Sequence, residues 1–73
     1  MKDIDLHGVK HEDVGTLLDN FIWDCMKANA TSADIITGNS SEMKRIVREA
    51  VAEYGYTTQD SLTNNGMLIL NLL

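Results

Sequence analysis

The sequence predicts a small α/β domain, a two-layer sandwich in which two helices cover one face of a mixed four-stranded sheet in the order βαβαββ. Short hydrophobic segments alternate with two longer segments whose apolar residues recur every three and four positions. Glycine follows the first two short segments and also ends the second long one. The chain has 73 residues, which suits one domain. We therefore expect residues 1–73 to form a single domain.

The first strand and the first helix are defined by different periodicities. Ile4 and Leu6 alternate with charged or polar residues, which is the pattern of a strand that is buried on one face only. A helix is expected over residues 11–29. Its apolar stripe consists of Val14, Leu17, Leu18, Phe21, Ile22, Cys25 and Met26. Because the second face of the strand is polar, both helices should pack on the same side of the sheet.

A second strand and a second helix follow a connector of small residues. Residues 34–37 form a short hydrophobic strand that ends at Gly38. Ser40 or Ser41 can cap the following helix, and Gly55 can end it in a left-handed conformation. The apolar stripe of this helix consists of Met43, Ile46, Val47, Ala50, Val51 and Tyr54.

The last two strands should form an antiparallel pair. The third strand begins in residues 56–58, residues 64–66 form a turn, and residues 67–72 form the fourth strand. The fourth strand is almost continuously apolar, so it should lie inside the sheet. Strands that are joined by a helix should be parallel. We expect the core to include Leu6, Ile36, Leu68 and Leu70.

Composition restricts the classes of function. The formal net charge of −5 argues against general nucleic-acid binding, which depends on lysine and arginine. Three of the six basic residues nevertheless lie close together on the second helix, so a local positive patch is expected there. They are Lys44, Arg45 and Arg48.

The N-terminus has no apolar signal core, and the longest apolar run is too short to span a membrane. We therefore expect a cytoplasmic protein with no membrane partner. Cys25 is the single cysteine, which excludes an internal disulfide and a thiolate metal cluster in the monomer.

The strongest candidates for chemistry are Asp5 and His7, which project from the same side of the first strand. A carboxylate beside an imidazole fixes its tautomer and raises its basicity, as a general base near neutral pH requires. In the structural alternative, Asp5 hydrogen-bonds the Gly8 turn and His7 is an exposed strand end. Asp3 and Asp5 share one face and could hold Mg²⁺ weakly.

A second candidate site is the turn over residues 37–41, which leads into the second helix. Unpaired backbone amides at such a position bind anions, and phosphate is a natural ligand. The alternatives are an ordinary capped turn and, for the basic residues that follow, an ordinary solvated helix face. Trp23 lies away from the apolar stripe of the first helix and should be partly exposed, where it could stack a base or contact a protein.

Three segments together resemble the Smr (small MutS-related) domain family. They are Ile4-Asp5-Leu6-His7-Gly8, the Thr37-Gly38 turn, and the closing run Met67–Leu72. The family is marked by a D-L-H-G segment, a [T/H]-G-x-G turn and a hydrophobic strand after a glycine-containing loop. Its Asp and His are tied to nucleic-acid cleavage, which implies the same role for Asp5 and His7. Ser40 replaces the second glycine of the turn.

The resemblance implies a small endonuclease that cleaves phosphodiester bonds in DNA or RNA and requires no cofactor. His7 would act as the acid or base, and Asp5 would orient it. The predicted phosphate-binding residues are Gly8, Thr37, Gly38, Asn39, Ser40, Lys44, Arg45 and Arg48. One alternative is a non-catalytic nucleic-acid or ribosome-associated binding module, which the acidic charge and the departure at Ser40 favour. Another is a protein-interaction module that uses Trp23 or an edge strand. The oligomeric state stays open.

Overall fold

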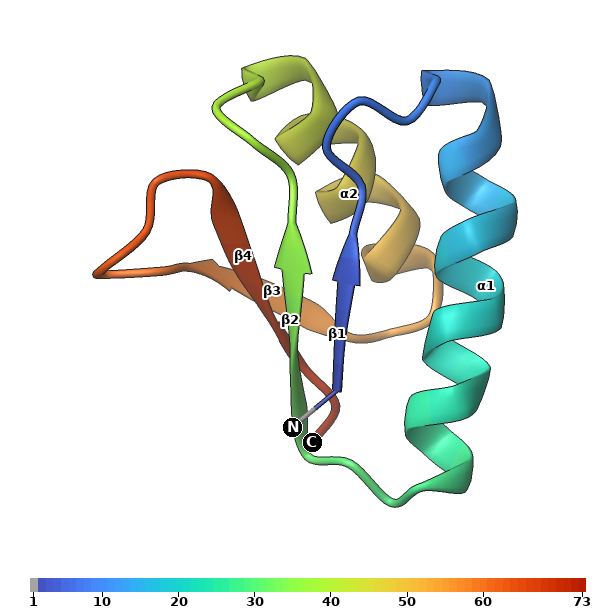
Figure 1. Cartoon of the computed structure of the whole chain (residues 1–73). Helices are drawn as coiled ribbons and strands as arrows, with labels where there is room; N and C mark the ends of the chain where they lie inside the picture. The colour runs from blue at the N-terminus through green and yellow to red at the C-terminus, as the bar shows by residue number, and fades with distance from the viewer. Residues whose placement is uncertain (1) are drawn as a thin grey trace.

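The computed structural model describes residues 2–73 and contains the helices and strands in the predicted order (Figure 1). The strands are β1 (Lys2–Asp5), β2 (Ser32–Ile36), β3 (Thr57–Asp60) and β4 (Met67–Asn71), and the helices are α1 (His11–Lys27) and α2 (Ser41–Glu53). They form one sheet with strand order β1-β2-β4-β3, in which β1 and β2 are parallel and the other two pairs are antiparallel. The mixed sheet and the interior position of β4 are confirmed.

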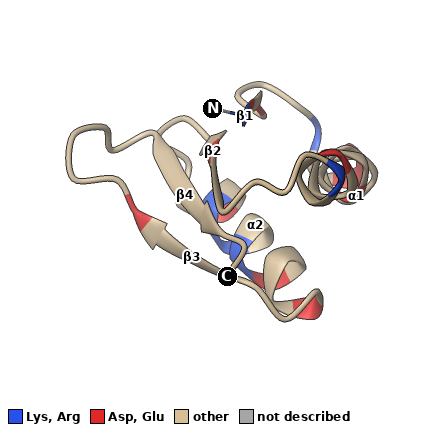
Figure 2. Ribbon diagram, turned by 90° about the horizontal axis from the view of Figure 1, so that it is seen from below, with Lys and Arg blue, Asp and Glu red and all other residues tan. Residues whose placement is uncertain are grey.

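Both helices lie on one face of the sheet and pack against each other, as Figures 1 and 2 show. This arrangement confirms the two-layer sandwich. Among residues 2–73, neither helix has the length and apolar character needed to span a membrane.

The core lies between the helices and one face of the sheet. Its buried apolar residues are Leu6, Val14, Leu18, Phe21, Ile22, Cys25, Ala33, Ile35, Met43, Val47, Val51, Leu68 and Leu70. The prediction that Ile36 belongs to this core is wrong. Along β2 every second residue is buried, so Ile35 faces the helices, whereas Ile36 is half-buried on the opposite face, where Met67 is its register partner. Burial raises the pKa of the Cys25 thiol, which keeps this side chain neutral within the core.

The helix ends follow the local chemistry of the sequence. The Ser40 hydroxyl accepts a hydrogen bond from the backbone N–H of Met43 at 3.0 Å, and Gly55 follows α2 with φ +81°. Helix α1 ends at Lys27, before the predicted Asn29, because Asn29 adopts φ +55° and breaks the helical path. Strand β2 begins at Ser32, earlier than predicted, because Ser32 pairs with Asn71 of β4.

The predicted site residues lie together at one end of the sheet. The carboxyl ends of β1 and β2 lie at the same end as the amino ends of both helices, at the top of Figure 1. The start of β1, the C-terminus and the carboxyl end of α1 lie at the bottom. The predicted site residues belong to loops at the first of these ends.

Candidate functional site

Three loops meet beyond the carboxyl ends of β1 and β2. The carbonyl oxygen of Gly66, in the β3–β4 loop, accepts hydrogen bonds from the backbone N–H groups of Thr37 at 2.7 Å and Gly38 at 3.0 Å. A Cβ atom added at Gly66 would lie 3.3 Å from the Cα and carbonyl carbon of Gly38. The two backbones are therefore in direct contact. We call residues 7–8, 37–40 and 64–66 the three-loop site.

The imidazole of His7 packs against Gly38. Gly38 has φ +70°, and a Cβ atom at this position would lie only 2.6 Å from Cδ2 of His7. Only a residue without a side chain leaves room for the ring in this place. The fold thus brings together the histidine of the first sequence motif and the glycine of the second.

The β1–α1 loop turns at Gly8. The backbone N–H of Val9 donates to the carbonyl of Leu6 at 3.1 Å, which closes a four-residue turn. Gly8 occupies the third position of that turn with φ +80°, a conformation that favours glycine. A Cβ atom at Gly8 would meet no heavy atom within 4 Å. This loop is therefore open to solvent beside Gly8.

Asp5 acts on the main chain of His7. Its Oδ1 accepts a hydrogen bond from the backbone N–H of His7 at 2.9 Å. Within residues 2–73 the carboxylate makes no hydrogen bond to the imidazole, so the predicted contact that would orient the ring is not formed. The structure instead matches the alternative in which Asp5 stabilises the Gly8 turn, and this contact fixes the position from which the His7 side chain projects.

Thr37 and Gly38 hold the loops together. Thr37 is 2% exposed, and its hydroxyl group hydrogen-bonds to the carbonyls of Gly38 at 2.9 Å and Gly66 at 3.2 Å. The amides of both residues are already engaged by Gly66. In this structure, therefore, these two amides donate to a carbonyl from a distant part of the chain and present no free N–H to a phosphate.

The next backbone amides are available instead. Those of residues 39–42 donate to no acceptor within residues 2–73, since the hydroxyl of the N-cap Ser40 is used by Met43 and the helical hydrogen bonds begin further on. Asn39 and Ser40 thus keep their place among the candidate anion ligands. These amides lie at the positive end of the α2 dipole.

The three basic residues of α2 have different surroundings. Arg45 forms ion pairs with Glu42 and with Glu49, the second at 3.0 Å, and Arg48 pairs with Asp60 at 2.9 Å. Hydrogen bonding to Arg45 lowers the pKa of Glu42 below its usual value. Basic and acidic segments accordingly alternate along α2 in Figure 2. The single positive patch that we predicted is therefore divided by carboxylates.

Lys44 is the basic residue that reaches the three-loop site. Its Nζ donates a hydrogen bond to the carbonyl oxygen of Asn65. Within residues 2–73 it has no carboxylate within ion-pair distance, so its charge is not neutralised as those of the two arginines are. Lys44 is thus the best placed of the three to attract an anion.

No metal centre is formed by residues 2–73, in which no three His, Cys, Asp or Glu side chains are grouped so that they could hold an ion. Asp3 and Asp5 are both exposed, and one oxygen of Asp5 is already engaged by the His7 amide. Trp23, the other residue singled out from the sequence, is 53% exposed, which confirms its predicted partial exposure. It belongs to α1, and in the described part of the chain no hydrogen bond or ion pair joins its side chain to the three-loop site.

The β3–β4 loop contributes more than the hairpin turn that its sequence indicated. The Oδ1 of Asn64 accepts the backbone N–H of Gly66 at 2.8 Å. The Ser61 hydroxyl accepts those of Thr63 at 3.3 Å and Asn64 at 3.2 Å. These contacts hold the Gly66 carbonyl in position against β2. The Asn-Asn-Gly run predicts a turn, but it does not indicate which residues donate hydrogen bonds to the Gly66 carbonyl.

Comparison with known proteins places the chain in a family. The family model of the Smr domain matches residues 4–64, which include the first two of the three segments that carry the resemblance, and the chain therefore belongs to the Smr domain family. This family is associated with nuclease or nucleic-acid-binding roles.

Among solved structures, the crystal structure of the Smr domain of Thermus thermophilus MutS2 has the same fold, with a TM-score of 0.89 at 15% sequence identity. The match covers 100% of this chain and 99% of that one. A comparison with curated protein sequences found no match.

Proposed function

We propose that this domain is an endonuclease that cleaves phosphodiester bonds in DNA or RNA at the three-loop site. The observation that carries the proposal is the position of the His7 imidazole, an exposed acid–base group packed on Gly38 at the meeting point of the three loops. Membership of the Smr family supports a nucleic-acid substrate. We also retain the prediction that the protein acts in the cytoplasm.

In this proposal His7 accepts a proton from the attacking water or hydroxyl group, or donates one to the leaving oxygen. Asp5 is a positioning residue, because it binds the His7 main chain and not the reacting group. Lys44 and the free amides at the start of α2 hold the phosphate and stabilise the charge that develops on it. Gly8 leaves the approach to His7 open.

A non-catalytic nucleic-acid-binding module is the second candidate. One observation favours it: within residues 2–73 the Asp5 carboxylate makes no hydrogen bond or ion pair with the imidazole, so His7 lacks the carboxylate partner expected for it from the sequence. Such a module would use the same amides and Lys44 to bind phosphate without cleaving it.

The deciding experiment is a nuclease assay of the purified protein on supercoiled DNA and on structured RNA, with and without EDTA. His7→Ala should lower the cleavage rate by roughly two to four orders of magnitude, which is the usual contribution of a positioned proton-transfer group. The thermal midpoint should stay almost unchanged, because His7 is exposed.

His11→Ala is the matched control, since His11 is also exposed and lies at the start of α1. It should cleave at the wild-type rate. Unchanged cleavage in a folded His7→Ala variant would end the catalytic proposal. Binding of nucleic acid without cleavage by the wild-type protein would leave the binding module as the better account.

A further inference from the structure

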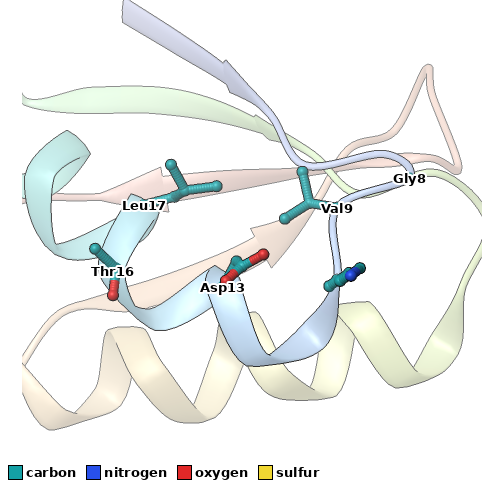
Figure 3. Close-up of a pocket in the computed structure, with 6 residues that line it drawn as sticks. Gly8, Val9, Asp13, Thr16 and Leu17 are labelled. Atoms are coloured by element: carbon teal, nitrogen blue, oxygen red, sulfur yellow. The ribbon is translucent and has the colours of Figure 1, made fainter.

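A groove lies beside the three-loop site, between the β1–α1 loop and the first turns of α1 (Figure 3). Its volume is about 540 Å³, and it begins at Gly8, the residue that follows His7. Its lining consists of Gly8, Val9, Lys10, Asp13, Thr16 and Leu17. None of these residues except Gly8 belongs to the site described above.

The groove combines apolar walls with two unpaired charges. Val9 is half-buried, and Leu17 is 40% exposed although it belongs to the apolar stripe of α1. Asp13 projects between them in Figure 3. Within residues 2–73, neither the Asp13 carboxylate nor the Lys10 ammonium group has an ion-pair partner or a side-chain hydrogen bond. Thr16 adds a hydroxyl group to the lining.

We propose that this groove binds an unpaired guanine nucleotide of a single-stranded nucleic acid, next to the phosphodiester bond at His7. The inference rests on the proposed function and names its substrate class. Val9 and Leu17 would pack against the base, and Lys10 would contact its phosphate. A nucleotide has a flat base, which can pack on apolar side chains, and a phosphate, which a cation attracts. The groove offers both kinds of contact, together with a carboxylate that can accept hydrogen bonds from the base.

Asp13 determines which base fits. A carboxylate only accepts hydrogen bonds, and it can accept two at once from neighbouring donors. Guanine offers two adjacent N–H donors, at N1 and N2, on its Watson–Crick edge. On the same edge of adenine, cytosine and uracil or thymine, each donor stands beside an acceptor, which a carboxylate repels. Because a base pair would use this edge, the guanine must be unpaired.

The probes are fluorescently labelled single strands of ten thymidines or ten uridines, with a central guanosine, inosine or adenosine. Inosine lacks only the N2 amino group of guanosine. We expect the guanosine strand to bind roughly tenfold more tightly than the inosine strand in fluorescence anisotropy, since one hydrogen bond to a charged group is lost. The adenosine strand should bind no better than the inosine strand.

Asp13→Asn should reduce the preference for guanosine to within roughly twofold, because an amide presents one acceptor beside one donor. It should not weaken the binding of plain thymidine strands, because the carboxylate that repels their bases is lost. Lys10→Gln should weaken all strands alike and lower the salt dependence by about one phosphate contact. Asp24→Asn is the control, an exposed carboxylate near the other end of α1. It should keep the preference.

The outcomes separate the two proposals. Binding or cleavage without a preference for guanosine, or a preference that survives in Asp13→Asn, overturns the guanine site while the endonuclease stands. Equal affinity for a guanosine that is paired in a duplex overturns the requirement for an unpaired base. If no nucleic acid binds at low salt, both the proposed function and the guanine site fail.

Discussion

The turns at Gly8 and Gly38 each place a glycine after a strand, but the first glycine is open to solvent and the second is tightly packed. Each follows a short parallel strand, and each glycine has a positive φ, of +80° and +70° respectively. Beside Gly8 the space is empty, whereas Gly38 lies against the His7 ring and the Gly66 backbone. The Gly38 turn is therefore part of the framework that positions His7, and the Gly8 turn is an open edge where a ligand can approach.

This difference changes how the candidate site is understood. From the sequence, both turns were expected to offer ligands to a phosphate. In the structure the amides of Thr37 and Gly38 already donate hydrogen bonds to the Gly66 carbonyl, and the free amides begin one residue later, at Asn39. A glycine turn after a parallel strand is thus evidence for a binding site only when its backbone groups are not already engaged.

The largest effect is expected from alanine at the two glycines. Gly38→Ala should lower stability by about 1–2 kcal/mol for the positive φ alone, with a further loss because the new Cβ displaces the His7 ring. For a domain of this size, each kcal/mol lowers the thermal midpoint by roughly 4–8 °C. Cleavage should fall as well, since His7 moves.

Gly8→Ala is the matched variant, because it has the same strain in φ without a clash. Its thermal midpoint should fall by less than that of Gly38→Ala, and its cleavage rate should stay closer to wild type. Equal losses in the two variants, measured by thermal melts and by cleavage on the same preparations, would show that the two turns do not differ as described.

A smaller effect is expected at Asp5. Asp5→Asn keeps an oxygen that can accept the His7 backbone N–H, so it should retain most of the stability and most of the cleavage rate. Asp5→Ala removes the acceptor and should cost about 0.5–1.5 kcal/mol. Chemical denaturation and the nuclease assay measure both. A loss of several orders of magnitude in the Asn variant would mean that the carboxylate charge acts directly on the imidazole.

The smallest effect is expected at Lys44. Lys44→Gln should weaken nucleic-acid binding roughly two- to fivefold at low salt, because one unpaired cation at the three-loop site is lost. Arg48→Gln should change binding less, since Arg48 is paired with Asp60. A salt titration by anisotropy measures both variants. A stronger effect at Arg48 would show that its ion pair opens to bind phosphate.

Much of the fold could be predicted from the sequence because the signals are local. The Ser40 cap and the Gly55 stop depend on residues within one helical turn, and they lie where the sequence indicated. The interior position of β4 followed from its almost continuous apolar sequence, and the exposure of Trp23 followed from the helical periodicity of α1. Asp5, His7 and Gly38 were recognised as motif residues, and the contact of Asp5 with the Gly8 turn was one of two alternatives, but the packing of His7 on Gly38 was not predicted.

The sequence by itself determined the order of the elements, the apolar faces of the helices and the places where glycine turns occur, since these depend on neighbours in the chain. Only the tertiary structure decided that Gly66 occupies the amides of Thr37 and Gly38, and that Arg48 pairs with Asp60. It also decided that Ile35 and not Ile36 enters the core. The physical reason is that strand register and distant hydrogen-bond partners depend on how separate segments pack, which no local pattern encodes.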